Sequence, residues 1–386
     1  MKNKLILLAF SFYLLLFAVP AKSQDQGVLR ENAFVSLLTC GAGSEVESYF
    51  GHTAIRVCDT AQGIDLVYNY GTYDFDQPHF YWTFARGDLN YCLSRTTYWA
   101  FLQTYTYEQR AVYEQRLNLT QQQRDNMFVL LENNYHPDYR YYRYDFFRDN
   151  CATRPRDILE SALGHRSLHY AEPLSPTSYR DVLYASTDEH LWWRLAFDIV
   201  LGIPTDHRCD SRELMFAPLL LMQQVATETT GNGQPLAAER QQILPEHPAA
   251  DGWQASPLVL AWCLMLVVLA LTMLSFRYGW TLRWLDIILY GAGFLIALLL
   301  LFLWLGTNHR YTEWNLNLLW ASPLWLYFLI RGAKSRPWLI VVQLALLLLA
   351  LLTALVGWPQ HLNSAVIPIT LVFFIRLIAL SRQKQQ

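Results

Sequence analysis

Hydrophobic and polar residues divide the chain into two unequal parts. Residues 24–256 mix apolar and polar positions as a soluble domain does, whereas residues 257–380 are mostly Leu, Ile, Val, Ala and Trp. A helix needs about 20 apolar residues to cross a bilayer, and the second part contains five stretches of roughly that kind. They are residues 258–276, 284–305, 316–330, 338–356 and 366–380. The pattern predicts an α-helical bundle of five transmembrane helices over 257–380, followed by a cytoplasmic tail at 381–386.

The first 23 residues have the pattern of a secretory signal peptide. Lys2 and Lys4 form a basic start, residues 5–19 are apolar, and Ala21 and Ser23 are small residues at the positions that a signal peptidase requires. The alternative interpretation is an uncleaved anchor helix. In both cases the segment after residue 24 is exported.

Basic residues predict the orientation of the helical bundle. If residues 24–225 form a periplasmic domain, the loops on the inner side contain Arg277, Arg283, Arg331, Lys334, Arg336, Arg382 and Lys384, and those on the outer side contain only Arg310. Cytoplasmic loops are enriched in Lys and Arg. We therefore expect a multi-pass protein of the inner membrane of a Gram-negative cell, with residues 226–256, rich in Gln, Glu, Thr, Gly and Pro, as the linker between the two domains.

Short strands precede helices in the predicted periplasmic domain. Residues 34–39, 53–58 and 65–70 have the pattern of buried strands, and residues 91–98 have a weaker one. Thr120 and Gln123 form a capping-box signal for a helix that runs to about residue 135. Residues 139–147 are predicted to be extended, and residues 157–163 to be a helix that Gly164 ends. This order predicts an α+β domain.

Composition excludes several classes of function. Aromatic residues make up 15% of the chain, which excludes disorder, and the net charge of -2 argues against a nucleic-acid partner. The six cysteines have no zinc-site spacing, so we predict no metal and no cofactor. An oxidising compartment permits a disulfide such as Cys40–Cys58, but the sequence does not determine the pairing.

Two segments carry residues suited to nucleophilic catalysis. His52 stands at the start of an apolar strand, and Cys151 stands where an extended segment turns into a helix, with Asp149 and Asn150 as candidate caps. A helix N-terminus is expected to lower the thiol pKa, and its free N–H groups to form an oxyanion hole. The alternative is a buried structural cysteine and a structural histidine. Pro155 indicates that the helix begins nearer Thr153 than Cys151.

At these segments the sequence resembles a known family. The stretches FVSLLTCGAGSEVESYFGHTAIRV, YNYGTYDFD, YDFFRDNCATRPRDIL and LGIPTD…ELMFAP are similar to the Lnb N-terminal periplasmic domain family. The resemblance covers about residues 28–224, and the helical part looks like the C-terminal region of the same family. It implies a permuted papain-like fold of the lecithin:retinol acyltransferase type, in which the histidine precedes the cysteine. The stretch GAGSE departs from relatives that have a Pro before the Gly, which affects only a loop.

The resemblance implies a lipoprotein N-acyltransferase. Such an enzyme moves a fatty acyl chain, through an acyl-thioester, from a phospholipid acyl donor to the α-amine of a diacylglyceryl-cysteine lipoprotein, its acceptor. Carried over to this chain, Cys151 matches the nucleophile and His52 the general base. Asn69 is the candidate third residue that orients His52; its alternative role is that of a turn amide before Gly71.

Further polar residues are candidates for substrate binding. Arg148, Arg154 and Arg156 are candidates to hold a phospholipid head group, because Arg binds phosphate with two parallel hydrogen bonds; ion pairs with neighbouring carboxylates are the favoured interpretation. The predicted outer loop is unusually polar and contains Asn308, His309, Asn315 and Asn317. These four are candidates for substrate positioning, with loop solvation as the alternative.

Two rival functions remain open at the level of the sequence. Many permuted papain-like domains cut peptides, so a membrane-anchored papain-like cell-wall amidase or endopeptidase is the first alternative, although one anchor helix is enough for it. A non-catalytic sensor or scaffold is the second alternative. It predicts that loss of the Cys151 thiol changes nothing.

Overall fold

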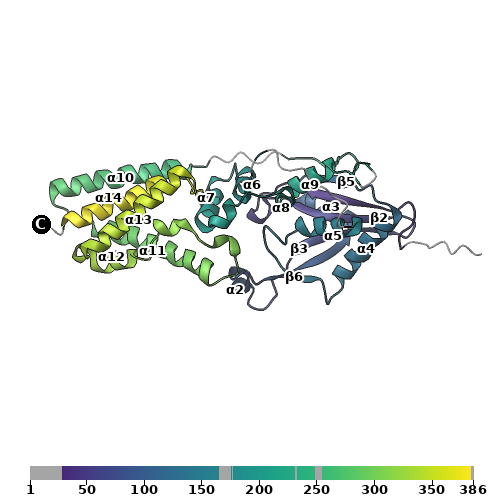
Figure 1. The fold of residues 1–386 in the computed structure, drawn as a ribbon, viewed down its shortest axis with the longest axis horizontal. Helices are drawn as coiled ribbons and strands as arrows, with labels where there is room; N and C mark the ends of the chain where they lie inside the picture. Colours follow the sequence, from purple (N-terminus) through teal and green to yellow (C-terminus); the bar gives the residue numbers. More distant parts are fainter. Residues whose placement is uncertain (1–27, 165–174, 176, 231–232, 248–253, 384–386) are drawn as a thin grey trace, which may run out of the picture.

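The computed structural model describes residues 28–164, 175, 177–230, 233–247 and 254–383. The predicted signal peptide lies outside these residues. The molecule is elongated: a sheet domain built from the first half of the chain lies at one end, and a bundle of long helices lies at the other (Figure 1).

A seven-stranded sheet forms the core of the first domain, and all its neighbouring strands are antiparallel. The strand order is β6-β4-β3-β2-β1-β5-β7. The strands are β1 (Phe34–Cys40), β2 (His52–Asp59), β3 (Ile64–Thr72), β4 (Asn90–Thr97), β5 (Val112–Arg116), β6 (Tyr141–Arg143) and β7 (Gln241–Leu244). All four predicted strands are present, so the α+β prediction is confirmed.

Helices cover both faces of the sheet. Side chains alternate along a strand, so Leu37 faces one side of β1 and Leu38 faces the other. The Leu37 side packs against α4 (Gln121–Tyr135) and α5 (Thr153–Leu163). The Leu38 side packs against α3 (Tyr98–Tyr107). Both faces of the central strands are therefore buried, which explains their nearly continuous apolar sequences.

Local signals set the ends of the predicted helices. The Thr120 side chain accepts a hydrogen bond from the Gln123 N–H, and the Gln123 side-chain oxygen accepts one from the Thr120 N–H, which is the predicted capping box. Gly164 follows α5 with a φ of 85°. The predicted extended segment 139–147 is only partly extended: β6 covers three residues, and Asp145 then accepts N–H bonds in a turn.

The predicted linker is largely part of the sheet domain, which corrects the expectation of a free connection over 226–256. β7 pairs with β5 and forms one edge of the sheet, and Leu236 is fully buried in the core. The polar composition of this segment reflects its place at the sheet edge.

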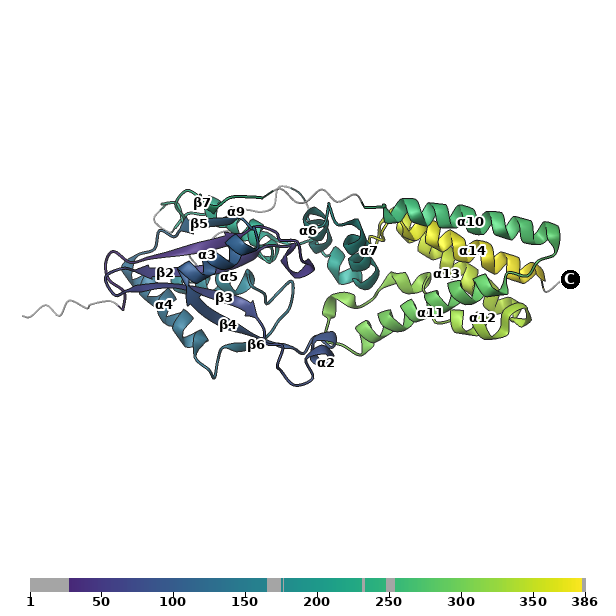
Figure 2. The ribbon, with the colours of Figure 1, turned by 180° about the vertical axis from the view of Figure 1, so that it is seen from behind.

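Further short helices and turns complete the sheet domain. They are α2 (Phe80–Ala85), α6 (Tyr179–Ser186), α7 (Leu191–Val200), α8 (Ser211–Leu214) and α9 (Pro218–Thr227), with 3-10 turns η1 (Val46–Ser48) and η2 (Ile203–Asp206). Figure 2 shows α2 and α7 on the side of the sheet domain that faces the bundle.

The bundle contains α10 (Pro257–Tyr278), α11 (Arg283–Leu305), α12 (Trp325–Arg331), α13 (Pro337–Val356) and α14 (Val366–Gln383). Within the described residues, α10, α11 and α13 are long and apolar enough to cross a membrane. The prediction of five transmembrane helices is therefore not confirmed. α14 coincides with the fifth predicted span, but it contains Arg376 and is not one of these candidates.

The third predicted span, residues 316–330, is wrong as a single helix. The segment forms a 3-10 turn, η4 (Leu316–Leu319), and the seven-residue α12, separated by a stretch that contains Pro323. Proline has no N–H and interrupts a helix. Trp320 and Trp325 are almost completely buried among the other helices, and irregular backbone is tolerated at membrane depth where protein surrounds it.

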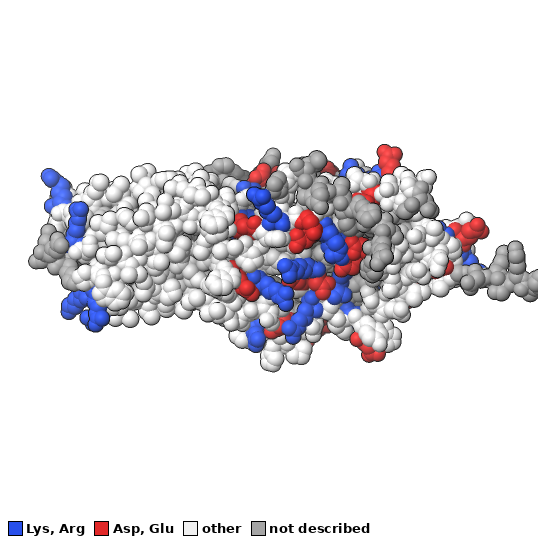
Figure 3. All heavy atoms as spheres, viewed as in Figure 1, with Lys and Arg blue, Asp and Glu red and all other residues white. Residues whose placement is uncertain are grey.

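Charged side chains mark the two ends of the molecule. On the face in Figure 3, acidic and basic residues mix over the sheet domain, the surface of the bundle is uncharged, and the far end of the bundle bears only Lys and Arg. The C-terminus of α14 lies at that end (Figure 1). This distribution agrees with the predicted orientation, in which the sheet domain is periplasmic.

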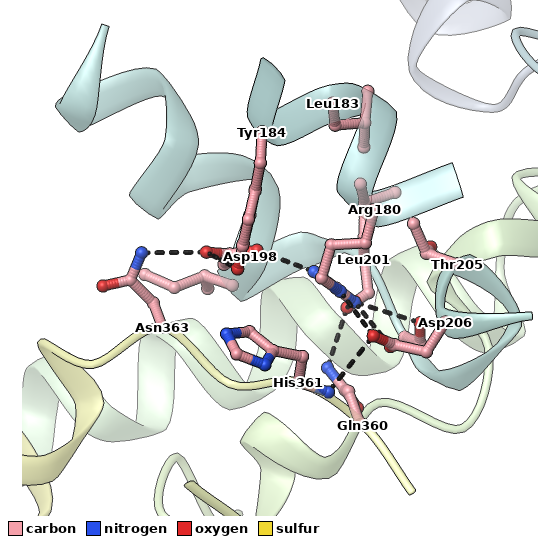
Figure 4. Close-up of polar contacts among 12 residues, drawn as sticks. Arg180, Leu183, Tyr184, Asp198, Leu201, Thr205, Asp206, Gln360, His361 and Asn363 are labelled. Atoms are coloured by element: carbon pink, nitrogen blue, oxygen red, sulfur yellow. Dashed lines mark hydrogen bonds and ion pairs between the residues drawn. The ribbon is translucent and has the colours of Figure 1, made fainter. Parts of the chain in front are cut away.

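A buried polar network joins the two parts (Figure 4). Arg180 of α6 is 2% exposed and donates to Asp198 of α7 at 2.7 Å and to Asp206 of η2 at 2.9 Å. Asp198 in turn accepts from Asn363, which precedes α14, at 2.8 Å. The backbone N–H of His361 donates to Asp206 at 3.2 Å. The ion cluster therefore connects the sheet domain to the outer end of the bundle.

Candidate active site

His52 and Asn69 come together because β2 and β3 pair in register. Asn69 lies opposite Ala54, and both His52 and Asn69 face the side of the sheet that α3 covers. His52 Nε2 lies 3.3 Å from Asn69 Oδ1. A carbonyl oxygen only accepts, so Nε2 carries the proton in the neutral imidazole. The other ring nitrogen, Nδ1, is then unprotonated and able to accept a proton.

Cys151 reaches the same end of the sheet from the opposite layer, two residues before α5. The register between β3 and β4 shifts between Asn69 and Thr72, where β3 bends at Gly71. Gly71 has a φ of 91°, and a Cβ at this position would lie 3.5 Å from the Cβ of Cys151. The thiol is held by the backbone N–H of Thr53 and the hydroxyl of Tyr144. The structure thus brings Cys151 beside the residue that follows His52, although no hydrogen bond joins the two side chains among the described residues.

The start of α5 is organised by Asn150 rather than left open. Asn150 Oδ1 accepts from the N–H groups of Ala152 and Thr153 at 2.8 and 2.9 Å, and its Nδ2 donates to the carbonyl of Phe216 at 2.8 Å. The prediction that the helix begins at Thr153 is confirmed. The expectation that the first N–H groups of the helix are free for an oxyanion is wrong for Ala152 and Thr153, because Asn150 already occupies them.

Burial determines the charge state of the pair. It raises the pKa of the Cys151 thiol to about 11, against the lowering effect of hydrogen bonds from Thr53, from its own backbone and from Tyr144. Burial, together with the positive charge of Arg110, lowers the pKa of His52 to about 4. The expectation that the helix start lowers the thiol pKa is therefore not met, because desolvation outweighs it. At neutral pH the site holds a neutral thiol and a neutral imidazole.

A cavity of about 260 Å³ opens beside His52 and Asn69. Its lining includes Phe101 and Tyr105 of α3 and four hydroxyl side chains, those of Thr72, Ser94, Thr96 and Thr104. Hydroxyls both donate and accept hydrogen bonds. The cavity thus offers both hydrogen-bonding groups and apolar surface to a substrate.

Arg154 and Arg156, two of the arginines predicted to bind a head group, have partners inside the domain. Arg154 pairs with Asp149 at 2.5 Å and lies 3.5 Å from the ring centroid of Tyr142. Arg156 is 5% exposed and donates to Asp157 at 2.7 Å and to the carbonyl of Arg212 at 2.8 Å. These contacts favour the ion-pair interpretation for both residues.

The four polar residues of the predicted outer loop lie at the junction of the two parts, away from the cavity lining. Asn308 donates to Asp88 at 2.6 Å, and His309 lies 3.2 Å from the carbonyl of Ala85. Asn315 and Asn317 each donate to the backbone of α7, at 2.8 Å. Their contacts fix the sheet domain on the bundle, and their predicted role in substrate positioning stays a prediction.

Sequence reasoning missed three groups at the site. Tyr144 lies in the segment 139–147, which the sequence predicts only to be extended, yet its hydroxyl contacts the thiol; its place within YDFFRDNC is the available signal. Arg110 and the Thr53 N–H reach the site through tertiary packing, which no local pattern in the sequence indicates. All six cysteines are unpaired. Cys40 lies opposite His52 and Cys58 opposite Phe34, at the two ends of the β1–β2 ladder, so the suggested Cys40–Cys58 disulfide cannot form.

Comparisons with known proteins match both parts of the chain. Residues 25–185 match the family model of the Lnb N-terminal periplasmic domain, and residues 249–386 match the model of the Lnb transmembrane domain. The curated proteins and the solved structures contain no match to this chain.

Proposed function

The chain belongs to the Lnb family of inner-membrane proteins with a periplasmic domain, and from this premise we propose that it is a lipoprotein N-acyltransferase with Cys151 as its nucleophile. The observation that carries the proposal is the position of three side chains at one end of the sheet. The side-chain oxygen of Asn69 lies 3.3 Å from Nε2 of His52, and the thiol of Cys151 contacts the N–H of Thr53, the residue that follows His52. A nucleophile, a base and a group that orients the base are the parts that covalent acyl transfer needs.

The first half-reaction acylates the enzyme. As the sulfur of Cys151 attacks the ester carbonyl of a phospholipid, Nδ1 of His52 takes the thiol proton, because Asn69 keeps the proton of the ring on Nε2. The tetrahedral intermediate collapses with cleavage of the carbon–oxygen bond. His52 returns the proton to the leaving alcohol, so a lysophospholipid departs and a thioester remains on Cys151.

The intermediate of this step carries a negative oxygen that needs hydrogen-bond donors. The three donors that already contact the sulfur, the N–H groups of Thr53 and of Cys151 itself and the hydroxyl of Tyr144, are the candidates for that role. The N–H groups of Ala152 and Thr153 are occupied by Asn150. Replacing Tyr144 with Phe therefore removes one candidate donor to the oxyanion and leaves the nucleophile in place.

The second half-reaction transfers the acyl group to an amine. The α-amine of the diacylglyceryl-cysteine lipoprotein attacks the thioester, a carbon–nitrogen bond forms, and the carbon–sulfur bond breaks. His52 takes one proton from the attacking amine and returns it to the sulfur of Cys151. Water has to be kept from the thioester during this step, since hydrolysis makes the enzyme a lipase.

The proposal is tested in cells by mass spectrometry of lipoprotein N-termini. Cells that lack this chain are supplied with the wild-type protein, Cys151→Ala, His52→Ala or the control Cys209→Ala, which removes a buried thiol elsewhere in the same domain. We expect N-acylated lipoproteins with the wild type and the control, and free α-amines with the two site variants. N-acylation by Cys151→Ala at the wild-type level contradicts the proposal.

The same cells distinguish the alternative function. A cell-wall amidase or endopeptidase changes the cross-links or stem peptides of peptidoglycan and leaves lipoprotein N-termini unchanged. A Cys151-dependent change in muropeptides with normal N-acylation therefore supports that alternative and contradicts the acyltransferase.

A further inference from the structure

The segment that contains helix α2 runs from the end of β3, beside the candidate active site, to the bundle. The segment of residues 73–88 directly follows β3, whose Gly71 lies against Cys151. In both ribbon views α2 lies beside the C-terminal end of α11 (Figures 1 and 2). This segment therefore spans the distance between the nucleophile and a candidate transmembrane helix.

Specific contacts fix the segment at the outer end of α11. The backbone N–H of Asn308 donates to the carbonyl of Arg86 at 2.8 Å, and the side chain of Asn308 donates to Asp88 at 2.6 Å. The ring of Trp82 lies 6.1 Å from that of Phe302, which is in the last turn of α11. In the orientation supported by the basic residues, this turn is at the periplasmic surface of the membrane. Trp82 is thus held at the level where the hydrocarbon of the outer leaflet ends.

The surface of α2 is strongly apolar and exposed. Tyr81 is 83%, Trp82 57% and Phe84 54% exposed, and Phe75, which precedes the helix, is 65% exposed. Residues 77–85 contain no Asp, Glu, Lys or Arg. Leu305, at the end of α11, is 74% exposed, so the lipid-facing surface of the bundle continues onto α2. Aromatic residues favour the boundary between hydrocarbon and head groups, which makes a phospholipid monolayer the fitting partner for this surface.

A row of aromatic rings connects α2 to the thiol. Phe80, Phe75, Tyr73, Tyr91 and Tyr144 form this aromatic row, with successive centroids 4.8, 5.2, 5.2 and 4.4 Å apart. None of the five rings is fully buried, and the last of them contacts Cys151. The row offers apolar surface from the membrane boundary to the nucleophile, whereas the cavity beside His52 is lined with hydroxyls.

We propose that α2 inserts its aromatic face into the outer leaflet and that the aromatic row guides the acyl chain of a phospholipid from the leaflet to Cys151. The partner of this surface is the bilayer itself. The second part of the inference rests on the proposed function, because it assigns the route by which the acyl donor reaches the nucleophile. The first part, insertion of α2, does not depend on the chemistry at Cys151.

Lipid crosslinking tests the insertion of α2. The full chain is reconstituted into phosphatidylethanolamine–phosphatidylglycerol vesicles after Tyr81 is replaced by the photoreactive residue p-benzoylphenylalanine. The control carries the same replacement at Tyr107, which is 90% exposed on α3 and also aromatic. Illumination and mass spectrometry are expected to find phospholipid attached at position 81 and not at position 107. Equal labelling at the two positions, or none at position 81, overturns the insertion.

A comparison of two acyl donors tests the route. The variant Phe75→Ser/Phe80→Ser, which removes the two rings of the row nearest the bundle, is assayed for acylation of Cys151 by vesicle phospholipid and by a water-soluble short-chain p-nitrophenyl ester. The matched control variant is Trp99→Ser/Tyr107→Ser, which removes two exposed aromatic residues from α3. Loss of two aromatic side chains of the row is expected to lower the rate with phospholipid by about tenfold or more, and to leave the rate with the soluble ester unchanged. The control keeps both rates.

The outcomes separate the route from the proposed function. If the Phe75→Ser/Phe80→Ser variant keeps the wild-type rate with phospholipid, or loses both rates equally, the route is overturned while the acyltransferase stands. If the wild-type protein acylates Cys151 with neither donor, the proposed function fails and the route with it. The crosslinking result still decides whether α2 enters the leaflet.

Discussion

The neutral state of the Cys151–His52 pair predicts how the thiol reacts with an alkylating agent as pH is varied. The nucleophile is the thiolate, so the rate of alkylation follows the fraction of thiol that has lost its proton. With a pKa of about 11 for Cys151 and about 4 for His52, the imidazole does not stabilise the thiolate as a charged partner at neutral pH. We therefore consider the alkylation rate of Cys151 between pH 6 and 10 in the enzyme without substrate.

The magnitude follows from the pKa of the thiol. At pH 7 a group with a pKa of about 11 is ionised in roughly one molecule in 10,000, whereas a free cysteine with a pKa of about 8.5 is ionised to about 3%. Alkylation of Cys151 at pH 7 is thus expected to be about 300-fold slower than that of free cysteine, and to rise about tenfold per pH unit up to pH 10.

The assay uses iodoacetamide and the full chain in detergent micelles. Samples are quenched at intervals and digested, and the peptide that contains Cys151 is quantified by mass spectrometry, with N-acetylcysteine as the reference thiol. The variant His52→Ala is expected to keep the slope with pH, because a neutral imidazole forms no ion pair with the sulfur. This variant also separates the resting state from catalysis, in which His52 is required as the base.

A thiolate–imidazolium pair gives the opposite result. Its alkylation rate is nearly constant between about pH 5 and 8, and it falls when His52 is removed. A flat profile in this range, together with such a loss in His52→Ala, refutes the assignment of a neutral pair. It also refutes the argument that desolvation outweighs the helix start at Cys151.

Three further predictions concern the surroundings of the site and the junction of the two parts. Besides burial, the positive charge of Arg110 lowers the pKa of His52, so Arg110→Met is expected to raise that pKa. The acidic limb of the acylation rate, measured in a pH–rate profile from 4 to 8, is then expected to move to higher pH. An unchanged limb contradicts the effect of the Arg110 charge on His52. Arg180→Met leaves the buried Asp198 without its ion partner, and chemical denaturation is expected to show a loss of about 3–5 kcal/mol in the free energy of unfolding. The control is Arg143→Met, which removes a side chain that is 69% exposed and is expected to cost under about 1 kcal/mol. Similar costs for the two variants refute the role of the network. A Cβ on Gly202 lies 1.8 Å from the carbonyl oxygen of Glu313, so Gly202→Ala is expected to lower the melting temperature and expose the junction to protease, whereas Gly291→Ala, with no atom within 4 Å, leaves both unchanged.

The elements with strong local signals were predictable from the sequence. The strands around His52 and Asn69 have continuous apolar patterns, and Thr120 and Gly164 mark helix ends by their own chemistry. The pairing of His52 with Asn69 followed from the resemblance and from the expected neighbouring strands. These features depend on residues close in sequence or on one strand register, which explains why they could be read without coordinates.

The features that were missed depend on packing between distant segments. β7 has only four residues, two glutamines followed by Ile243 and Leu244, which is too short a pattern to indicate a strand; pairing with β5 determines it. The third predicted span is interrupted at Pro323, and its buried tryptophans are covered by other helices rather than lipid. The direction of the Cys151 pKa shift depends on how deeply the thiol is desolvated, which no spacing in the sequence can give.

The central claim is that the sulfur of Cys151 carries an acyl group between two substrates. The most direct measurement is the intact mass of the purified full chain after incubation with phospholipid vesicles in the absence of a lipoprotein acceptor. We expect a mass increase of one fatty acyl group, located on the peptide with Cys151, removed by neutral hydroxylamine, and absent in Cys151→Ala. An unmodified Cys151 under conditions in which the same preparation N-acylates an added lipoprotein contradicts the central claim.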